Sequence, residues 1–367
     1  MNGKSVLFLS LCALMFACTN KQTEENKTTT DSLNRAETII SPVIVTDTVQ
    51  KDSDDPAVWV NPKDPSQSLI IGTDKDADGA LYVFDLQGKV QKNKVVTGLK
   101  RPNNVDIEYG LTLKGVATDI AVTTERLTHK LRIFSLPDMQ PVDNGGIEVF
   151  ENETSEGFRD LMGIALYKDK NGDIYAIVGR KTGPTTGGYL WQYLLKDDGT
   201  GHVKASLVRK FGTYSGKKEI ESIMVDDDLG YVYYSDEGVG VRQYYADPTK
   251  GNQELSLFAT TGFTEDHEGI SLYKLSATEG YILVSDQGAN KFHIFSREGT
   301  KQNPFEHKLL KVVKVKANQS DGSETISLPL NNTFKHGLFI AMSDNRTFHL
   351  YRWEDIAGKE LKSIPAK

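Results

Sequence analysis

The feature that most constrains the fold is a recurring pattern of short apolar runs bounded by turn residues. Runs of Val, Ile, Leu, Tyr and Phe alternate with Gly, Asp and Asn clusters such as Asp85-Leu86-Gln87-Gly88 and Asp197-Asp198-Gly199, which is typical of short strands joined by turns. No long stretch has a helical period. The clearest runs are 68–72, 79–85, 115–123, 131–135, 174–179, 189–194, 231–235, 240–245, 281–285, 292–296, 338–342 and 348–353.

Pairs of these runs, such as 231–235 with 240–245, recur at intervals of about fifty residues, the spacing of propeller blades. A single all-β propeller fits better than a sandwich, because a sandwich of this length would need two copies. We expect the early segment 39–45 to close the ring by completing the last blade.

The amino-terminal segment is predicted to be a targeting sequence. Lys4 supplies a basic start, the run from Val6 to Ala17 is apolar, and this run is too short to span a bilayer. Residues 1–17 resemble a bacterial lipoprotein signal with Cys18 as the lipidated residue, although Met15 and Phe16 leave plain secretory cleavage as an alternative. Residues 18–37 are polar and predict a disordered tether, and residues 38–367 form the expected propeller domain.

Composition restricts the chemistry. Cys12 and Cys18 are the two cysteines of the chain, so the domain has no thiol for a disulfide, a zinc site or a nucleophile. The net charge of −7 and a pI near 5.6, without a basic block, argue against nucleic acid as a partner. An anionic substrate stays compatible if metal ions invert the local field.

Acidic residues gather just before an apolar run in Asp52-Ser53-Asp54-Asp55-Pro56-Ala57-Val58-Trp59-Val60. Pro56 biases Asp55 toward an extended conformation, and hard carboxylate oxygens on a stiff turn suit calcium. The alternative is a solvated acidic loop before a buried strand.

Further polar residues lie at the ends of other predicted strands, where a propeller would bring them to one end of its channel. Isolated cations accompany them, and metal-bound carboxylates with separate Lys and Arg donors suit phosphate; each cation alone is more often a solvated surface group. The polar residues are Asn103, Asn104, Asp106, Glu219, Glu221, Asp236, Glu237, Asp266, Glu268, Asp286 and Gln287, and the cations are Lys75, Arg126, Arg180 and Lys181.

Four motifs in order resemble the β-propeller phytases, calcium-dependent phosphatases of phytate (myo-inositol hexakisphosphate). They are Asp54-Asp55-Pro56-Ala57-Val58-Trp59, Asn103-Asn104-Val105-Asp106, Asp266-His267-Glu268-Gly269 and Ser285-Asp286-Gln287-Gly288. The resemblance extends from Asp52 to Ala357. It implies a six-bladed propeller of four- to five-stranded antiparallel blades, several calcium ions on one face, and a metal-bridging water that attacks phosphorus without a covalent intermediate.

The resemblance also implies roles for individual residues. Asp54, Glu221, Glu237, Asp266 and Glu268 match calcium ligands near the cleaved phosphate, and of these Asp54, Glu221, Glu237 and Glu268 are the predicted catalytic residues. Asp55, Pro56 and Val105 match a more structural calcium position, the last two through their carbonyls, and Gln287 matches another ligand. Lys75, Arg126 and Lys181 match phosphate-binding cations, with Arg180 added from the adjacent strand end.

Several positions depart from the family pattern. The catalytic glutamate is flanked as Ile220-Glu221-Ser222, Asp76 replaces a second lysine, and Met162 replaces a substrate-binding tyrosine. The aspartate-rich motif of the last blade is replaced by Asp321-Gly322-Ser323-Glu324-Thr325-Ile326, so that Asp321 or Glu324 is left to supply that ligand.

Two local patterns are interpreted as structural. Asp74-Lys75-Asp76-Ala77-Asp78-Gly79 fits the start of an EF-hand loop, but its flanks resemble strands, so a hairpin turn is expected. His267 lies between two proposed ligands, and strand alternation turns it to the opposite face.

The functional expectation is a lipid-anchored monomer in the bacterial cell envelope, at the outer membrane, that hydrolyses phytate or a related phosphate ester with calcium. Two rivals are a calcium-dependent lactonase or esterase, and a propeller that has lost catalysis and binds a glycan or protein.

Overall fold

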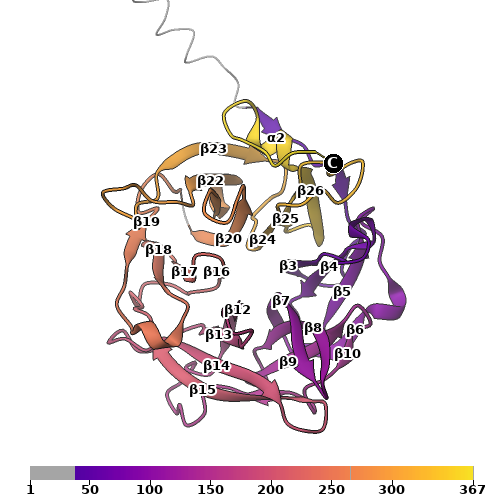
Figure 1. Ribbon diagram of the computed structural model, residues 1–367, viewed down its shortest axis with the longest axis vertical. Coiled ribbons are helices and arrows are strands. Elements are labelled where there is room, and N and C mark those ends of the chain that lie inside the picture. The colour runs from indigo at the N-terminus through magenta and orange to yellow at the C-terminus, as the bar shows by residue number, and fades with distance from the viewer. Residues whose placement is uncertain (1–37, 265, 367) are drawn as a thin grey trace, which may run out of the picture. The chain divides into compact units, whose positions relative to one another are not determined.

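The computed structural model describes residues 38–264 and 266–366, and Ile39–Lys367 form one compact unit. In the described residues the strands make six sheets of four or five strands, arranged as blades around an axis (Figure 1). The expected all-β six-bladed propeller is confirmed. The predicted signal peptide, Cys18 and the tether lie outside the described residues.

The first three blades follow the chain from the innermost strand outward. Blade 1 contains β3 (Ser53–Trp59), β4 (Leu69–Asp74), β5 (Gly79–Asp85) and β6 (Val96–Leu99). Blade 2 contains β7 (Pro102–Leu113), β8 (Val116–Glu125), β9 (Lys130–Leu136) and β10 (Gln140–Pro141), with β11 (Ile147–Glu148) also paired to β9. Blade 3 contains β12 (Leu161–Lys168), β13 (Ile174–Arg180), β14 (Leu190–Asp197) and β15 (Val203–Phe211).

The last three blades repeat this order. Blade 4 contains β16 (Ile223–Asp226), β17 (Tyr231–Asp236), β18 (Gly240–Tyr245) and β19 (Ser256–Phe258). Blade 5 contains β20 (His267–Lys274), β21 (Gly280–Asp286), β22 (Lys291–Ser296) and β23 (Leu309–Val315). Blade 6 contains β24 (Ser323–Ile326), β25 (Leu338–Ser343) and β26 (Thr347–Arg352), followed by α2 (Trp353–Ala357). Short 3₁₀ turns occur at Pro65–Gln67, Lys92–Lys94, Pro248–Lys250 and Gln287–Ala289.

Segment 39–45 closes the ring in two pieces rather than as the single strand expected. β2 (Ile44–Val45) pairs with β26 and completes blade 6, whereas β1 (Ile39–Ile40) adds a parallel strand to β23 of blade 5. Pro42 lies between them and has no N–H to donate to a ladder. The prediction is therefore right for β2 and wrong for β1.

The core lies between the blades. Apolar side chains of the described residues form six clusters, one for each pair of neighbouring blades. In the cluster that closes the ring, Phe84 of blade 1 packs against Phe348 of blade 6 with ring centroids 5.9 Å apart. Because both faces of each blade are buried, the blades hold their inner strands at fixed positions around the axis.

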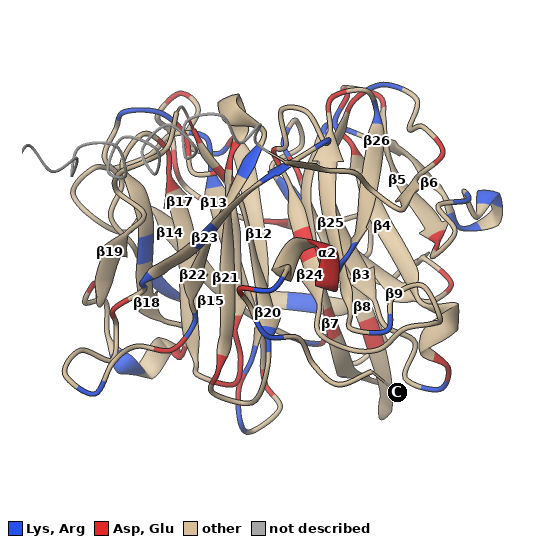
Figure 2. Ribbon diagram, turned by 90° about the horizontal axis from the view of Figure 1, so that it is seen from above, with Lys and Arg blue, Asp and Glu red and all other residues tan. Residues whose placement is uncertain are grey.

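Charged residues are common in the loops at both ends of the blades (Figure 2). The starts of the inner strands β3, β7, β12, β16, β20 and β24 surround one end of the axis, which we call the top mouth. The ends of these strands surround the other end, which we call the basal mouth.

Candidate active site

The top mouth collects most of the predicted site residues. Asp54 lies in β3, Glu268 in β20, and Glu221 two residues before β16. Glu237 follows β17, the neighbour of β16. Carboxylates that are far apart in the sequence thus meet because each lies at the same end of its blade.

Three of these carboxylates form a compact cluster. Glu221, Glu237 and Glu268 each offer one ligand atom, and these atoms all lie within 4.8 Å of one another. The side chains are buried, and Oε2 of Glu268 has no hydrogen-bond partner. Burial, followed by repulsion from Glu221, raises the pKa of Glu237 to about 8, and burial followed by repulsion from Glu237 raises the pKa of Glu268 well above its usual range.

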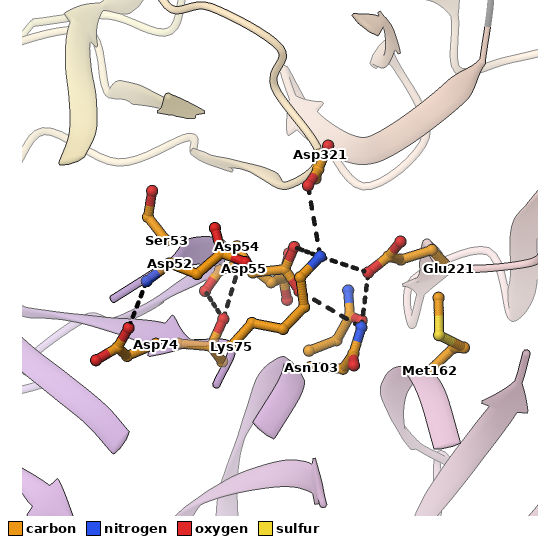
Figure 3. A network of polar contacts seen from close by, with 12 residues as sticks. Asp52, Ser53, Asp54, Asp55, Asp74, Lys75, Asn103, Met162, Glu221 and Asp321 are labelled. Atoms are coloured by element: carbon orange, nitrogen blue, oxygen red, sulfur yellow. Dashed lines mark hydrogen bonds and ion pairs between the residues drawn. The ribbon is translucent and has the colours of Figure 1, made fainter. Parts of the chain in front are cut away.

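Lys75 is the cation that faces this cluster. Its Nζ lies 2.5 Å from Asp54 Oδ1, 3.6 Å from Asp321 Oδ2 and 3.7 Å from Glu221 Oε1 (Figure 3). Burial alone would lower the pKa of Lys75, but the three carboxylates raise it. Lys75 is therefore the internal counter-charge of the top mouth.

Asn103, at the start of β7, joins the two sides of this network. Its Nδ2 donates to Glu221 Oε1 at 2.7 Å and to Asp54 Oδ2 at 3.5 Å (Figure 3). The sequence placed Asn103 in a motif without assigning it a role. Its position immediately before Asn104-Val105-Asp106 was the sequence feature that could have indicated a role in the site.

The last blade contributes Asp321, not Glu324, to this network. Asp321 contacts Lys75 and accepts a hydrogen bond from Nε2 of Gln287. Glu324 instead lines a chamber of about 200 Å³ further along the channel, together with Asp55, Pro56, Val105 and Asp106. Because Asp321 precedes β24 and Glu324 lies within it, the strand carries Glu324 away from the top mouth. Of the two alternatives for the last-blade ligand, Asp321 is the one that reaches Lys75.

Asp55 is held by the backbone of the neighbouring blade. The backbone N–H of Val105 donates to Asp55 Oδ2 at 3.0 Å. Burial raises the pKa of Asp55 well above its usual range. Gly322 of blade 6 approaches so closely that a Cβ there would lie 2.6 Å from Asp55 Oδ1.

Arg126 lies beside the cluster but is largely enclosed. Its Nε donates to the carbonyl of Leu161 at 3.1 Å, and Nη2 contacts Sδ of Met162. The guanidinium group of Arg126 thus contacts the thioether of Met162, at the position where the family pattern has the hydroxyl of a tyrosine. Burial lowers the pKa of Arg126, while Glu221 opposes this effect.

The structure corrects the prediction that Arg180 binds a substrate phosphate. Its side chain is fully buried and donates to the carbonyls of Phe158, Gly188 and Tyr189. Its guanidinium carbon also lies 4.5 Å from the ring centre of Phe150. The guanidinium group therefore braces the loops of blade 3 and is not exposed to bind a substrate phosphate.

Lys181 and Asp266 lie in a cleft of about 650 Å³ next to the cluster, which Glu237 and Tyr214 also line. Lys181 Nζ is 2.8 Å from Glu219 Oε1, and Lys218 Nζ is 2.5 Å from Asp266 Oδ1. The sequence missed Lys218, whose position in a Lys-rich loop resembles ordinary surface. The cleft thus holds two lysines, each paired with a carboxylate, beside the carboxylate cluster.

The two local patterns interpreted as structural are confirmed. β4 ends at Asp74 and β5 begins at Gly79, so Asp74–Gly79 is a hairpin turn, and Asp74 Oδ1 accepts the N–H groups of Lys51 and Asp52. His267 is buried, with Nε2 2.7 Å from the carbonyl oxygen of Ala259.

Three comparisons relate this chain to known proteins. The 3-phytase of Bacillus subtilis (strain 168) is 28% identical over 331 residues, which cover 85% of this chain and 82% of that protein. The WD40 β-propeller domain of Doa1 superposes with a TM-score of 0.46 and 10% identity, covering 84% of this chain and 95% of that one. The model of the Phytase family matches residues 4–362. The chain belongs to the Phytase family.

Proposed function

We propose that this protein is a calcium-dependent phosphatase that removes phosphate from phytate or a related phosphate ester. The observation that carries the proposal is the buried cluster of Glu221, Glu237 and Glu268, with ligand atoms within 4.8 Å of one another. Buried carboxylates this close repel one another unless a cation or protons neutralise them. An all-oxygen ligand set suits calcium.

The proposed calcium ligands come from the top mouth. Glu221, Glu237, Glu268 and Asp54 would hold calcium, with Asp266, Asp321 and Gln287 at the edge of the same mouth. When bound, calcium supplies the positive charge that neutralises a phosphate group and activates water toward it. Asn103 fixes the carboxylate of Glu221 through its 2.7 Å hydrogen bond, which preorients the ligand set.

The lysines provide the remaining recognition. Lys75 lies between Asp54, Glu221 and Asp321, so a phosphate oxygen bound there would meet an ammonium group held in place. Lys181 and Lys218 line the adjacent cleft and suit a second phosphate of a polyphosphorylated substrate. Such a substrate would find few guanidinium donors, because Arg180 is internal and Arg126 contacts Met162.

The decisive experiment measures phosphate release from phytate with calcium and then with excess chelator. Release that requires calcium and is lost in Glu221→Gln supports the proposal. The matched control is Glu279→Gln, which changes an exposed carboxylate 4.0 Å from Lys362 and should leave the rate unchanged. Calcium that raises the melting temperature without any phosphate release would instead indicate a binding propeller.

Replacement of the lysines distinguishes the proposed phosphatase from a lactonase or esterase. Replacing Lys75 and Lys181 by Met should raise the KM for a phosphate ester strongly. A lactonase or esterase activity would hardly change, because its substrate carries no phosphate.

For location we propose a lipid anchor at Cys18 in the bacterial outer membrane, with the domain acting as a monomer that contacts the membrane through the anchor alone and does not bind nucleic acid. Among the described residues no helix is long and apolar enough to cross a membrane. Incorporation of labelled palmitate that disappears in Cys18→Ala tests the anchor.

A further inference from the structure

The basal mouth contains a second cavity that the proposed phosphatase does not use. It is formed where the inner strands β3, β7, β20 and β24 end. Lys274, at the end of β20, lies six residues beyond Glu268, so the two are about 20 Å apart along the strand. The cavity is therefore separate from the top mouth.

The walls of this basal cavity are mostly apolar. It has a volume of about 550 Å³, and its apolar lining includes Val58, Val60, Ile107, Tyr109, Leu272 and Ile326. This size and character match those of small-molecule sites, which bury the ligand body against apolar side chains and orient it with a few polar groups.

The polar groups of the basal cavity are acidic. Asp106 and Glu324 line both this cavity and the inner chamber. Each accepts backbone N–H groups, but among residues 38–264 and 266–366 neither has an ion-pair partner. The nearby Lys274 instead contacts Asp228, with Nζ 3.1 Å from Oδ2.

A further polar atom in the same wall is unsatisfied. Thr325 is 5% exposed, and its Oγ1 has no hydrogen-bond partner. A buried hydroxyl normally finds one, and this hydroxyl lines the same cavity as the two carboxylates. A ligand with several hydrogen-bond donors would offer partners to this hydroxyl as well as to the carboxylates.

We propose that the basal cavity binds an amphipathic organic ammonium ion, with its ammonium group at Asp106, Glu324 and Thr325 and its apolar body against Leu272 and Ile326. A bare metal ion would use the carboxylates but not the apolar walls. A fatty-acid anion would be repelled by the carboxylates of Asp106 and Glu324, and the lysine of the cavity, Lys274, is already paired with Asp228. This site does not depend on the phosphatase activity of the top mouth.

The test is isothermal titration of the purified protein, in calcium-containing buffer, with hexylamine, hexanol and hexanoate as probes. A pH of 9 keeps hexylamine protonated and lies well above the ordinary pKa of a carboxyl group. Hexylamine should bind at least tenfold more tightly than hexanol, and hexanoate should not bind. Lengthening the amine from butyl to hexyl should increase affinity about fourfold per methylene.

Variants locate the site. Glu324→Gln keeps the shape of the side chain and should weaken hexylamine binding at least tenfold, whereas the surface variant Glu279→Gln should leave it unchanged. Equal binding of hexylamine and hexanol would overturn the proposal without requiring any variant. Unchanged binding in a folded Glu324→Gln, or loss of hexylamine binding whenever calcium is present, would also overturn it.

Discussion

Lys75→Met removes the internal counter-charge of the top mouth and should strongly destabilise the calcium-free protein. Lys75 Nζ is 2.5 Å from Asp54 Oδ1, and Asp54 is 1% exposed. Removing one partner of a buried ion pair leaves an uncompensated charge and costs about 3–5 kcal/mol. For a unit of about 330 residues, this corresponds to a fall in melting temperature of about 4–7 °C.

The pH of the assay follows from the sign of the pKa shift. Because the pKa of Lys75 is raised in the folded state, its contribution to stability is fully present below its ordinary pKa and is lost only as the pH rises through the folded value. Thermal unfolding in excess chelator at pH 7 therefore measures the whole effect.

Lys89→Met is the matched control. Lys89 Nζ is 2.9 Å from Asp47 Oδ1, but both side chains are exposed, 67% and 43% respectively, so this solvent-screened pair contributes little to stability. Calcium should restore more stability to Lys75→Met than to the control, since the freed carboxylates gain a cation that binds the folded state. Equal melting temperatures for the two variants in chelator would refute the role of Lys75 as counter-charge.

Three further predictions concern stability and calcium binding. The calcium-free protein should lose stability as the pH rises from about 4.5 to about 8. The reason is that the folded-state pKa of Glu237 is raised to about 8, and such a carboxyl group stabilises the fold only while it is protonated. A melting temperature that does not change across this pH range without calcium would contradict the prediction. Gly322→Ala should cost about 1–3 kcal/mol and weaken calcium binding in titrations, since the new Cβ would lie 2.6 Å from Asp55 Oδ1; unchanged stability and affinity would show that β24 can move away. Arg180→Met should lower the free energy of unfolding by about 2 kcal/mol or more and leave the KM for phytate unchanged, and a raised KM with normal stability would return Arg180 to the substrate site.

The sequence predicted the middle of each blade better than its edges. All twelve apolar runs correspond to the second or third strand of a blade, as 231–235 and 240–245 correspond to β17 and β18. These strands are buried on both faces, so they are continuously apolar. Outer strands such as β15 and β23 face solvent on one side and are less distinct in the sequence.

The motifs likewise predicted which carboxylates gather at the top mouth, because Asp54, Glu221 and Glu268 each lie at the start of an inner strand. They could not predict the direction of individual side chains. Arg180 and Lys181 are adjacent, yet Arg180 ends β13 and is fully buried, whereas Lys181 follows the strand and its side chain is 46% exposed.

The sequence by itself determined the propeller, its blade spacing and the acidic end of its channel, since these follow from local apolar runs and from turn chemistry repeated along the chain. Only the tertiary structure decided that Asp321 rather than Glu324 reaches Lys75, that Asn103 holds Glu221, and that two carboxylates line the basal cavity. The physical reason is that closing the ring sets distances between residues of different blades, and a shift of three residues along one strand moves a side chain by about 10 Å.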